Sequence, residues 1–151
     1  MNPILKDRFH HDGRGPELVK AWIEDGGLYL EAIDFFNPED PHKHEYKKHL
    51  WFDSPQAFMV TPEEEFHVAK RKIDWAEVGK AALFDLGRTQ WCEEFSNRHS
   101  SRCRHYLAMF YDEYLDILCE GIEVRDGGYK STANKAVDSI RTSSAGPLES
   151  L

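Results

Sequence analysis

Four segments of the chain have the apolar and aromatic composition that predicts β-strands. Leu28–Phe36 places Leu28, Leu30 and Ala32 on one face. His49–Asp53 and Gln56–Val60 are apolar and aromatic, and Ser54 with Pro55 separates them into one bent strand or two short ones. Ile122–Tyr129 adds a last strand and turn. These segments predict a small antiparallel sheet.

The segment Gly15–Gly27 is compatible with two structures. Pro16 suits the first position of a helix and the two glycines suit its end, so a short helix is slightly favoured. The alternative is a strand whose residues Val19, Ala21 and Ile23 share one face, followed by a tight hairpin turn at Asp25-Gly26-Gly27. The pattern does not decide between them.

Helices are predicted for most of the second half. Thr61-Pro62-Glu63-Glu64 has the composition of a capping box, and Asp74-Trp75-Ala76-Glu77 repeats it before a helix that Gly87 would end. Trp91–Leu118 keeps helical spacing around a polar break, which indicates one kinked helix or two consecutive ones. A short helix near 134–140 is also compatible with the sequence.

These elements predict an α+β fold, in which a small antiparallel sheet from the N-terminal half packs against two or three helices of the C-terminal half. With 151 residues, of which 40% are hydrophobic, the chain has material for one core, so we expect a single domain over 1–140 and a surface tail over 141–151. No apolar run is long enough for a membrane helix, and the charged N-terminus leaves no room for a secretory signal. We therefore expect a cytoplasmic protein whose three cysteines are reduced.

The net charge of -8 disfavours non-specific binding to nucleic acid or anionic lipid. One local exception is the segment Arg88–Met109, which contains four arginines and only two glutamates. A candidate anion-binding site follows from the basic side chains of this segment, namely Arg98, Arg102, Arg104 and His105. The alternative is that these arginines only neutralise nearby carboxylates. Nucleic acid bound through Arg98–Arg104 stays a minor hypothesis.

A thiol and an imidazole come together if 91–118 is one continuous helix, because Cys92, His99 and Cys103 then share a line along its surface. A thiolate beside an imidazole is the minimal nucleophile and base pair, and His99 with Cys103 could instead hold a metal. The favoured interpretation is that this line packs against the core. Two further histidine groups, His42 with His44 and His10 with His11, lie in stretches that are typical of solvated loops. We therefore predict no metal and no other cofactor.

Three carboxylates, Asp112, Asp116 and Glu120, would form a row at i, i+4 and i+8 of the same helix. Like charges at this spacing destabilise a helix slightly, so such a row can indicate a basic partner, although a solvated face explains it as well. No nucleotide-binding, zinc-finger or hydrolase motif is present. The leading hypothesis is therefore a small acidic protein that binds, and in doing so inhibits or neutralises, a protein partner. The alternative is a small enzyme acting on a phosphate or acyl substrate through His99, Cys103 and Arg102.

Overall fold

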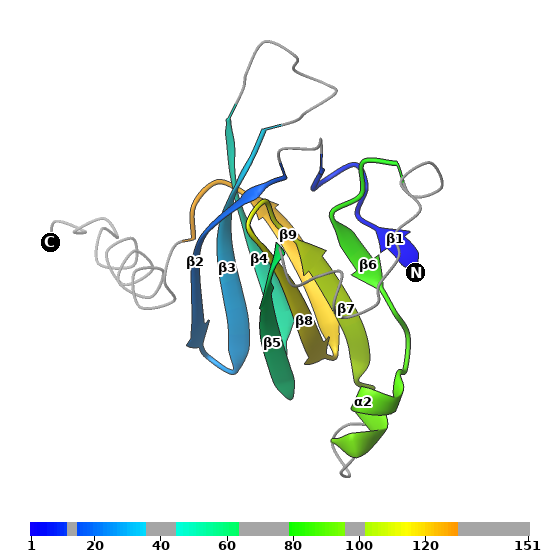
Figure 1. Ribbon diagram of the computed structural model, residues 1–151. Coiled ribbons are helices and arrows are strands. Elements are labelled where there is room, and N and C mark those ends of the chain that lie inside the picture. The colour runs from blue at the N-terminus through cyan, green and yellow to red at the C-terminus, as the bar shows by residue number, and fades with distance from the viewer. Residues whose placement is uncertain (12–14, 36–44, 64–78, 96–101, 130–151) are drawn as a thin grey trace, which may run out of the picture.

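The computed structural model describes residues 1–11, 15–35, 45–63, 79–95 and 102–129, and these form strands almost throughout (Figure 1). In chain order the elements are β1 (Asn2–Ile4), β2 (Glu17–Glu24), β3 (Gly27–Asp34), β4 (Tyr46–Asp53), β5 (Ala57–Pro62), β6 (Leu83–Asp85), α2 (Gln90–Glu94), β7 (Arg104–Met109), β8 (Glu113–Cys119) and β9 (Gly121–Asp126).

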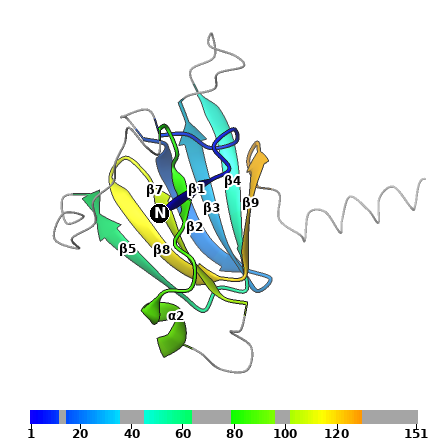
Figure 2. The same cartoon turned by 90° about the vertical axis from the view of Figure 1, so that its right-hand side faces the viewer.

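The strands form two antiparallel sheets that lie face to face (Figures 1 and 2). One sheet has five strands in the order β1-β6-β7-β8-β5, and the other has four in the order β2-β3-β4-β9. Three residues, Ser54 to Gln56, carry the chain from β4 in one sheet to β5 in the other. The two predicted strands on either side of Ser54 and Pro55 are thus confirmed, as separate strands in opposite layers.

The main core lies between the two sheets. Leu28 and Leu30 of β3 meet Leu115 and Ile117 of β8 in one cluster, and each of these side chains is at most 1% exposed. The strand predicted over 28–36 has Leu28, Leu30 and Ala32 on one face, because successive residues of a strand point to opposite faces. This is the face that lies in the core.

The five-stranded sheet is also covered on its outer face. Phe84, Leu107, Met109 and Tyr114 form a second buried cluster there. Strands β7 and β8 are therefore apolar at successive positions, because both of their faces are buried. The helix predicted over Trp91–Leu118 is confirmed only at its start, where residues 91–94 belong to α2, and it is wrong where β7 and β8 lie. Without alternation, the residues of these two strands also fit a helical period.

The α+β prediction is therefore wrong, because the described residues contain two antiparallel sheets and one helix of five residues. The helix favoured for Gly15–Gly27 is wrong too, and the hairpin alternative is confirmed. Asp25 and Gly26 have φ values of 49° and 71°, and positive φ at both central residues is what a type I′ turn requires. The last predicted strand is confirmed as β9.

The remaining helix predictions are only partly covered by the structure. Thr61 and Pro62 belong to β5 rather than to a helix cap, and residues 83–85, placed in the second predicted helix, form β6. Residues 64–78, the short helix near 134–140 and the tail 141–151 lie outside the described residues. No helix among the described residues is long and apolar enough to cross a membrane.

Gly15 sits where the segment before β2 passes close to the turn between β7 and β8. Its φ is +77°, and a Cβ added there would lie 2.6 Å from the backbone nitrogen of Tyr111. Gly127 offers a matched control, since its φ is +80° but nothing lies within 4 Å of an added Cβ. Substitution to alanine strains the backbone at both positions. Only at position 15 does the added Cβ also push the segment before β2 away from the backbone of Tyr111.

We expect Gly15→Ala to lower the free energy of unfolding by about 1–3 kcal/mol more than Gly127→Ala, which is the usual cost of overpacking. Urea unfolding followed by tryptophan fluorescence measures both values. Equal losses in the two variants would contradict the close approach of residue 15 to Tyr111.

Candidate functional site

The predicted anion-binding residues are not brought together in the part of the chain that the structure describes. Arg104 binds Asp85 through its Nε at 3.0 Å, whereas the next residue, His105, points to the opposite face of β7 and is buried. Arg102 is exposed, and Arg98 lies outside the described residues. Arg104 is thus neutralised by a carboxylate, but by Asp85 of β6 and not by one of the carboxylates expected on neighbouring helical turns.

The predicted acidic row is interrupted. Strand spacing sets residues four apart at about 13 Å, roughly twice the distance along a helix. Asp112 is exposed and Glu120 is half-buried, but Asp116 between them is only 1% exposed. Asp116 is thus turned away from solvent and cannot join the other two in one exposed surface.

The thiols of Cys92 and Cys103 are fully buried and pack with Leu118 in a small cluster on the outer face of the five-stranded sheet. Burial raises the pKa of Cys103 to about 11, and the adjacent Cys92 raises it further in the same direction. His99, the proposed base, lies outside the described residues. Both described cysteines occupy the packed position that the core interpretation expected.

Sequence reasoning missed a buried chain of three polar side chains. His105 Nε2 donates to Asp116 Oδ1 at 2.5 Å, and the Nδ1 of the same ring lies 3.0 Å from Thr89 Oγ1. Thr89 is the N-cap residue of α2, yet its hydroxyl makes no capping hydrogen bond. The imidazole therefore connects a hydroxyl on one element to a carboxylate on another.

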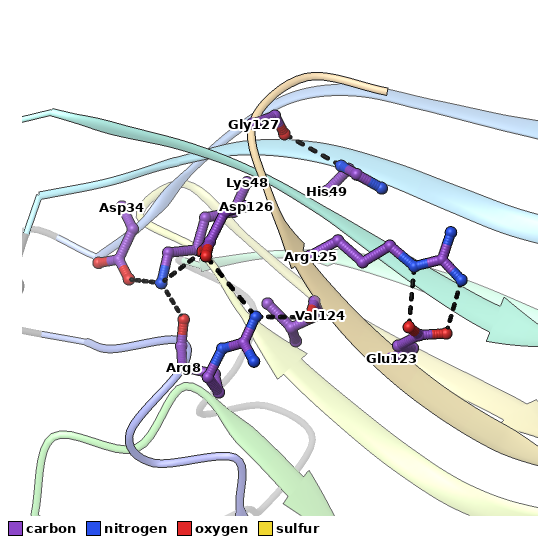
Figure 3. Close-up of polar contacts among 9 residues, drawn as sticks. All are labelled: Arg8, Asp34, Lys48, His49, Glu123, Val124, Arg125, Asp126 and Gly127. Carbon is purple, nitrogen blue, oxygen red and sulfur yellow. Dashed lines mark hydrogen bonds and ion pairs between the residues drawn. The ribbon is translucent and has the colours of Figure 1, made fainter. Parts of the chain in front are cut away.

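A second buried polar cluster surrounds Lys48 (Figure 3). The Lys48 ammonium lies 3.7 Å from Asp34 Oδ2 and 3.8 Å from Asp126 Oδ1, and it also donates to the carbonyl oxygen of Arg8. Asp34 accepts a further contact from His10 Nδ1 at 3.0 Å. The side chains of Asp34 and Lys48 are 1% and 6% exposed.

This cluster joins the N-terminal segment to three strands of the four-stranded sheet. Arg8 donates to the carbonyl of Val124 at 3.1 Å and lies 3.8 Å from Asp126, so the segment before β2 is tied to β9 as well as to β4 (Figure 3). Its charges are balanced by one another. We interpret the cluster as a structural ion-pair network rather than a reactive site.

Aromatic rings cover part of the outer face of the four-stranded sheet. Trp22 and Tyr29 are stacked with their centroids 5.4 Å apart, and Tyr129 packs over both of them. Tyr129 also contacts His49, whose Nδ1 lies 3.0 Å from the carbonyl oxygen of Gly127. The rings mainly cover each other, which leaves little aromatic surface for a ligand.

The exposed apolar surface is most concentrated on β5. Its three consecutive residues Phe58, Met59 and Val60 are 43%, 48% and 53% exposed. On one side β5 pairs with β8, and the described residues place no strand on its other side. Phe58 and Val60 oppose the core residues Ile117 and Leu115, whereas Met59 opposes Asp116, so both faces of β5 carry exposed apolar side chains.

Carboxylates lie at both ends of β5. At its C-terminal end, the amide of Glu63 donates to the carbonyl oxygen of Asp112 at 2.8 Å, and Pro62 opposes Glu113. Burial, with a smaller effect of Asp112, raises the pKa of Glu113. At the other end, the amide of Glu120 donates to the carbonyl oxygen of Asp53 at 2.9 Å. An uncharged strand thus lies between two acidic ends.

Comparison with known proteins gives no assignment: no protein-family model, no curated protein and no solved structure is significantly similar to this chain. The described residues also hold no group of three or more side chains suited to a metal ion. The candidate histidines His42 and His44 are outside the described residues. The Nδ1 of His10 is hydrogen-bonded to Asp34. The β5 edge is therefore the candidate site that the geometry supports best.

The buried ion pairs at Lys48 make a clear stability prediction. Lys48→Met leaves the buried carboxylate of Asp34 without its ammonium, and we expect a loss of about 3 kcal/mol in the free energy of unfolding. Lys47→Met alters the exposed neighbour and should change it by no more than about 0.5 kcal/mol. Urea unfolding of both variants checks this. Similar losses would show that the network contributes nothing particular to the fold.

Proposed function

We propose that this protein is an interaction module that binds an extended segment of a partner protein alongside β5. The observation that carries the proposal is a six-residue edge strand without charge and with three consecutive exposed apolar residues. An edge strand offers unpaired backbone amides and carbonyls to a second strand. Main-chain hydrogen bonds then supply affinity, and the apolar side chains on either face supply selectivity.

The other three sheet edges carry the features that discourage strand addition. β1 has only three residues, of which the middle one is Pro3. β2 contains three charged residues and an irregularity in register between Leu18 and Lys20. β9 ends in Glu123, Arg125 and Asp126 within its last four residues. Among the described edge strands, only β5 has five consecutive residues, 57–61, that carry neither a charge nor a proline, and Pro62 follows at its C-terminal end.

The surroundings of β5 define the chemistry of the partner segment. Its centre should be apolar to match Phe58, Met59 and Val60, and its ends should be basic to match Glu63 and Asp112 at one end and the Asp53 end of the strand at the other. This replaces the acidic row 112–116–120 as the binding surface. Binding of such a segment inhibits the partner protein if the segment belongs to the partner's active or binding site.

The enzyme alternative at His99, Cys103 and Arg102 has less support. Cys103 is fully buried with a raised pKa, and thiolate character is what makes a cysteine nucleophilic. Arg102 is exposed but has no described partner residue that would form a substrate site with it. The binding proposal, in contrast, rests on residues that are both described and exposed.

Val60→Lys tests the proposal directly, because natural edge strands use lysine to prevent pairing. The probe is a synthetic peptide of alternating valine and threonine with two lysines at each end, titrated against isotope-labelled protein by NMR. We expect chemical-shift changes centred on β5, and at least about a tenfold loss of affinity in Val60→Lys. Ile23→Lys is the matched control, since Ile23 is a 64% exposed branched residue on the β2 edge.

Two further measurements define the outcome. Glu63→Lys with Asp112→Lys should weaken binding of the basic-ended peptide and strengthen binding of the same peptide with glutamate ends. Sedimentation of the protein alone should give a monomer. Shift changes on β2 instead of β5, or a dimer that Val60→Lys dissolves, would refute a partner segment at this edge.

A further inference from the structure

Two of the three cysteines form a pair that the binding proposal does not use. Cys92 of α2 and Cys103, one residue before β7, pack together with Leu118. The third, Cys119, belongs to the core between the sheets, because successive residues of β8 point to opposite faces. The fold thus places two thiols side by side and keeps the third on the other side of the sheet.

The pair adjoins the buried chain of polar side chains. Cys92 Sγ lies 3.8 Å from Thr89 Oγ1, which in turn is 3.0 Å from His105 Nδ1. An ionised carboxylate only accepts, so Asp116 accepts a hydrogen bond from His105 Nε2, and in the neutral ring Nδ1 then accepts one from the threonine hydroxyl. A proton can therefore pass from the Cys92 thiol through the hydroxyl to the imidazole, with the carboxylate stabilising the resulting imidazolium.

We propose that Cys92 and Cys103 are a redox-active dithiol that forms an intramolecular disulfide by exchange with a low-molecular-weight disulfide, and that Thr89, His105 and Asp116 position and deprotonate Cys92. In the first step the Cys92 thiol gives its proton to His105 through Thr89. Its sulfur then attacks the small disulfide, which breaks to leave a mixed disulfide on Cys92 and one small thiolate.

In the second step the small thiolate released first takes the proton of Cys103, and the Cys103 sulfur then attacks Cys92 Sγ and displaces the other small thiolate, which takes the proton held by His105. The two thiol protons of the protein end on the two small thiols, so both cysteines are oxidised and one small disulfide is reduced. The order of attack follows from the environment of each sulfur. Burial and the neighbouring Cys92 keep Cys103 protonated, with a pKa of about 11, whereas Cys92 adjoins the relay.

Access to the pair depends on α2. This helix has five residues and lies beyond the ends of the strands (Figures 1 and 2). Three described contacts hold its start against β7: Thr89 with His105, the ring of Trp91 against that of His105, and Arg88 with the carbonyl oxygen of Cys103. Such a short element opens at low energetic cost compared with the core strands. The disulfide would then fix α2 to the start of β7.

The test incubates the folded protein in glutathione buffers of increasing disulfide content, quenches it with acid and measures intact mass and digested peptides. We expect a species lighter by about 2 Da, from the loss of two hydrogens, with the bond between residues 92 and 103. Cys119→Ser should oxidise in the same way, and Cys92→Ser should not form the species. Oxidation in urea should distribute bonds among all three cysteines.

The relay is tested by rate. Thr89→Val removes the hydroxyl at nearly constant volume and should slow disulfide formation by about tenfold or more, whereas Thr89→Ser should restore it. The final ratio of disulfide to dithiol should stay unchanged in all three proteins. The proposal is overturned if native protein bonds Cys119 first or forms no internal disulfide in the most oxidising buffer. Equal rates for Thr89→Val and the original protein would overturn the role of the relay.

Discussion

Strands β7 and β8 are covered on both faces, and this constraint determines most of what the molecule contains. The inner face packs against the four-stranded sheet, and the outer face is buried by the cluster around Phe84 and Leu107. A polar side chain in the buried part of these strands has no access to water, so it costs several kcal/mol unless it is hydrogen-bonded inside the protein (about 2–7 kcal/mol for a neutral group). His105 and Asp116 meet this condition by pairing with each other across neighbouring strands.

The same constraint separates what the sequence predicts from what it does not. Strands with one buried face alternate apolar and polar residues. β3 departs from this, since its first four residues are all buried, but it is readable because it is short, rich in apolar and aromatic residues and preceded by the turn at Asp25-Gly26. Where both faces are buried the alternation disappears, and Trp91–Leu118 then fits a helical period as well as it fits β7 and β8. The pattern of residues along the chain does not reveal that the outer face of the five-stranded sheet is buried, because this burial depends on how distant segments pack.

The candidate site was less predictable than the fold. Whether β5 lies at an edge depends on the sheet order, and local sequence carries no information about which strand ends the sheet. The hydroxyl, imidazole and carboxylate of Thr89, His105 and Asp116 are distant in sequence and need the docking of α2 on β7 to meet. The one usable signal was a histidine and an aspartate inside apolar runs, since such groups are seldom buried without a partner.

An exposed apolar edge should favour self-association, and the charge of the protein counters it. At a net charge of -8, two copies repel each other. Antiparallel pairing of β5 with β5 of a second copy would also set the end that holds Glu63 and Asp112 against the Asp53 end of the other strand, and both ends are acidic. Salt screens these repulsions beyond a Debye length of about 8 Å at physiological ionic strength, so they act mainly between charges at the edge itself.

A partner strand with basic ends is attracted at the same two ends of β5. In the proposed binding mode, the acidic ends discriminate between partners and the uncharged centre of β5 provides the pairing surface.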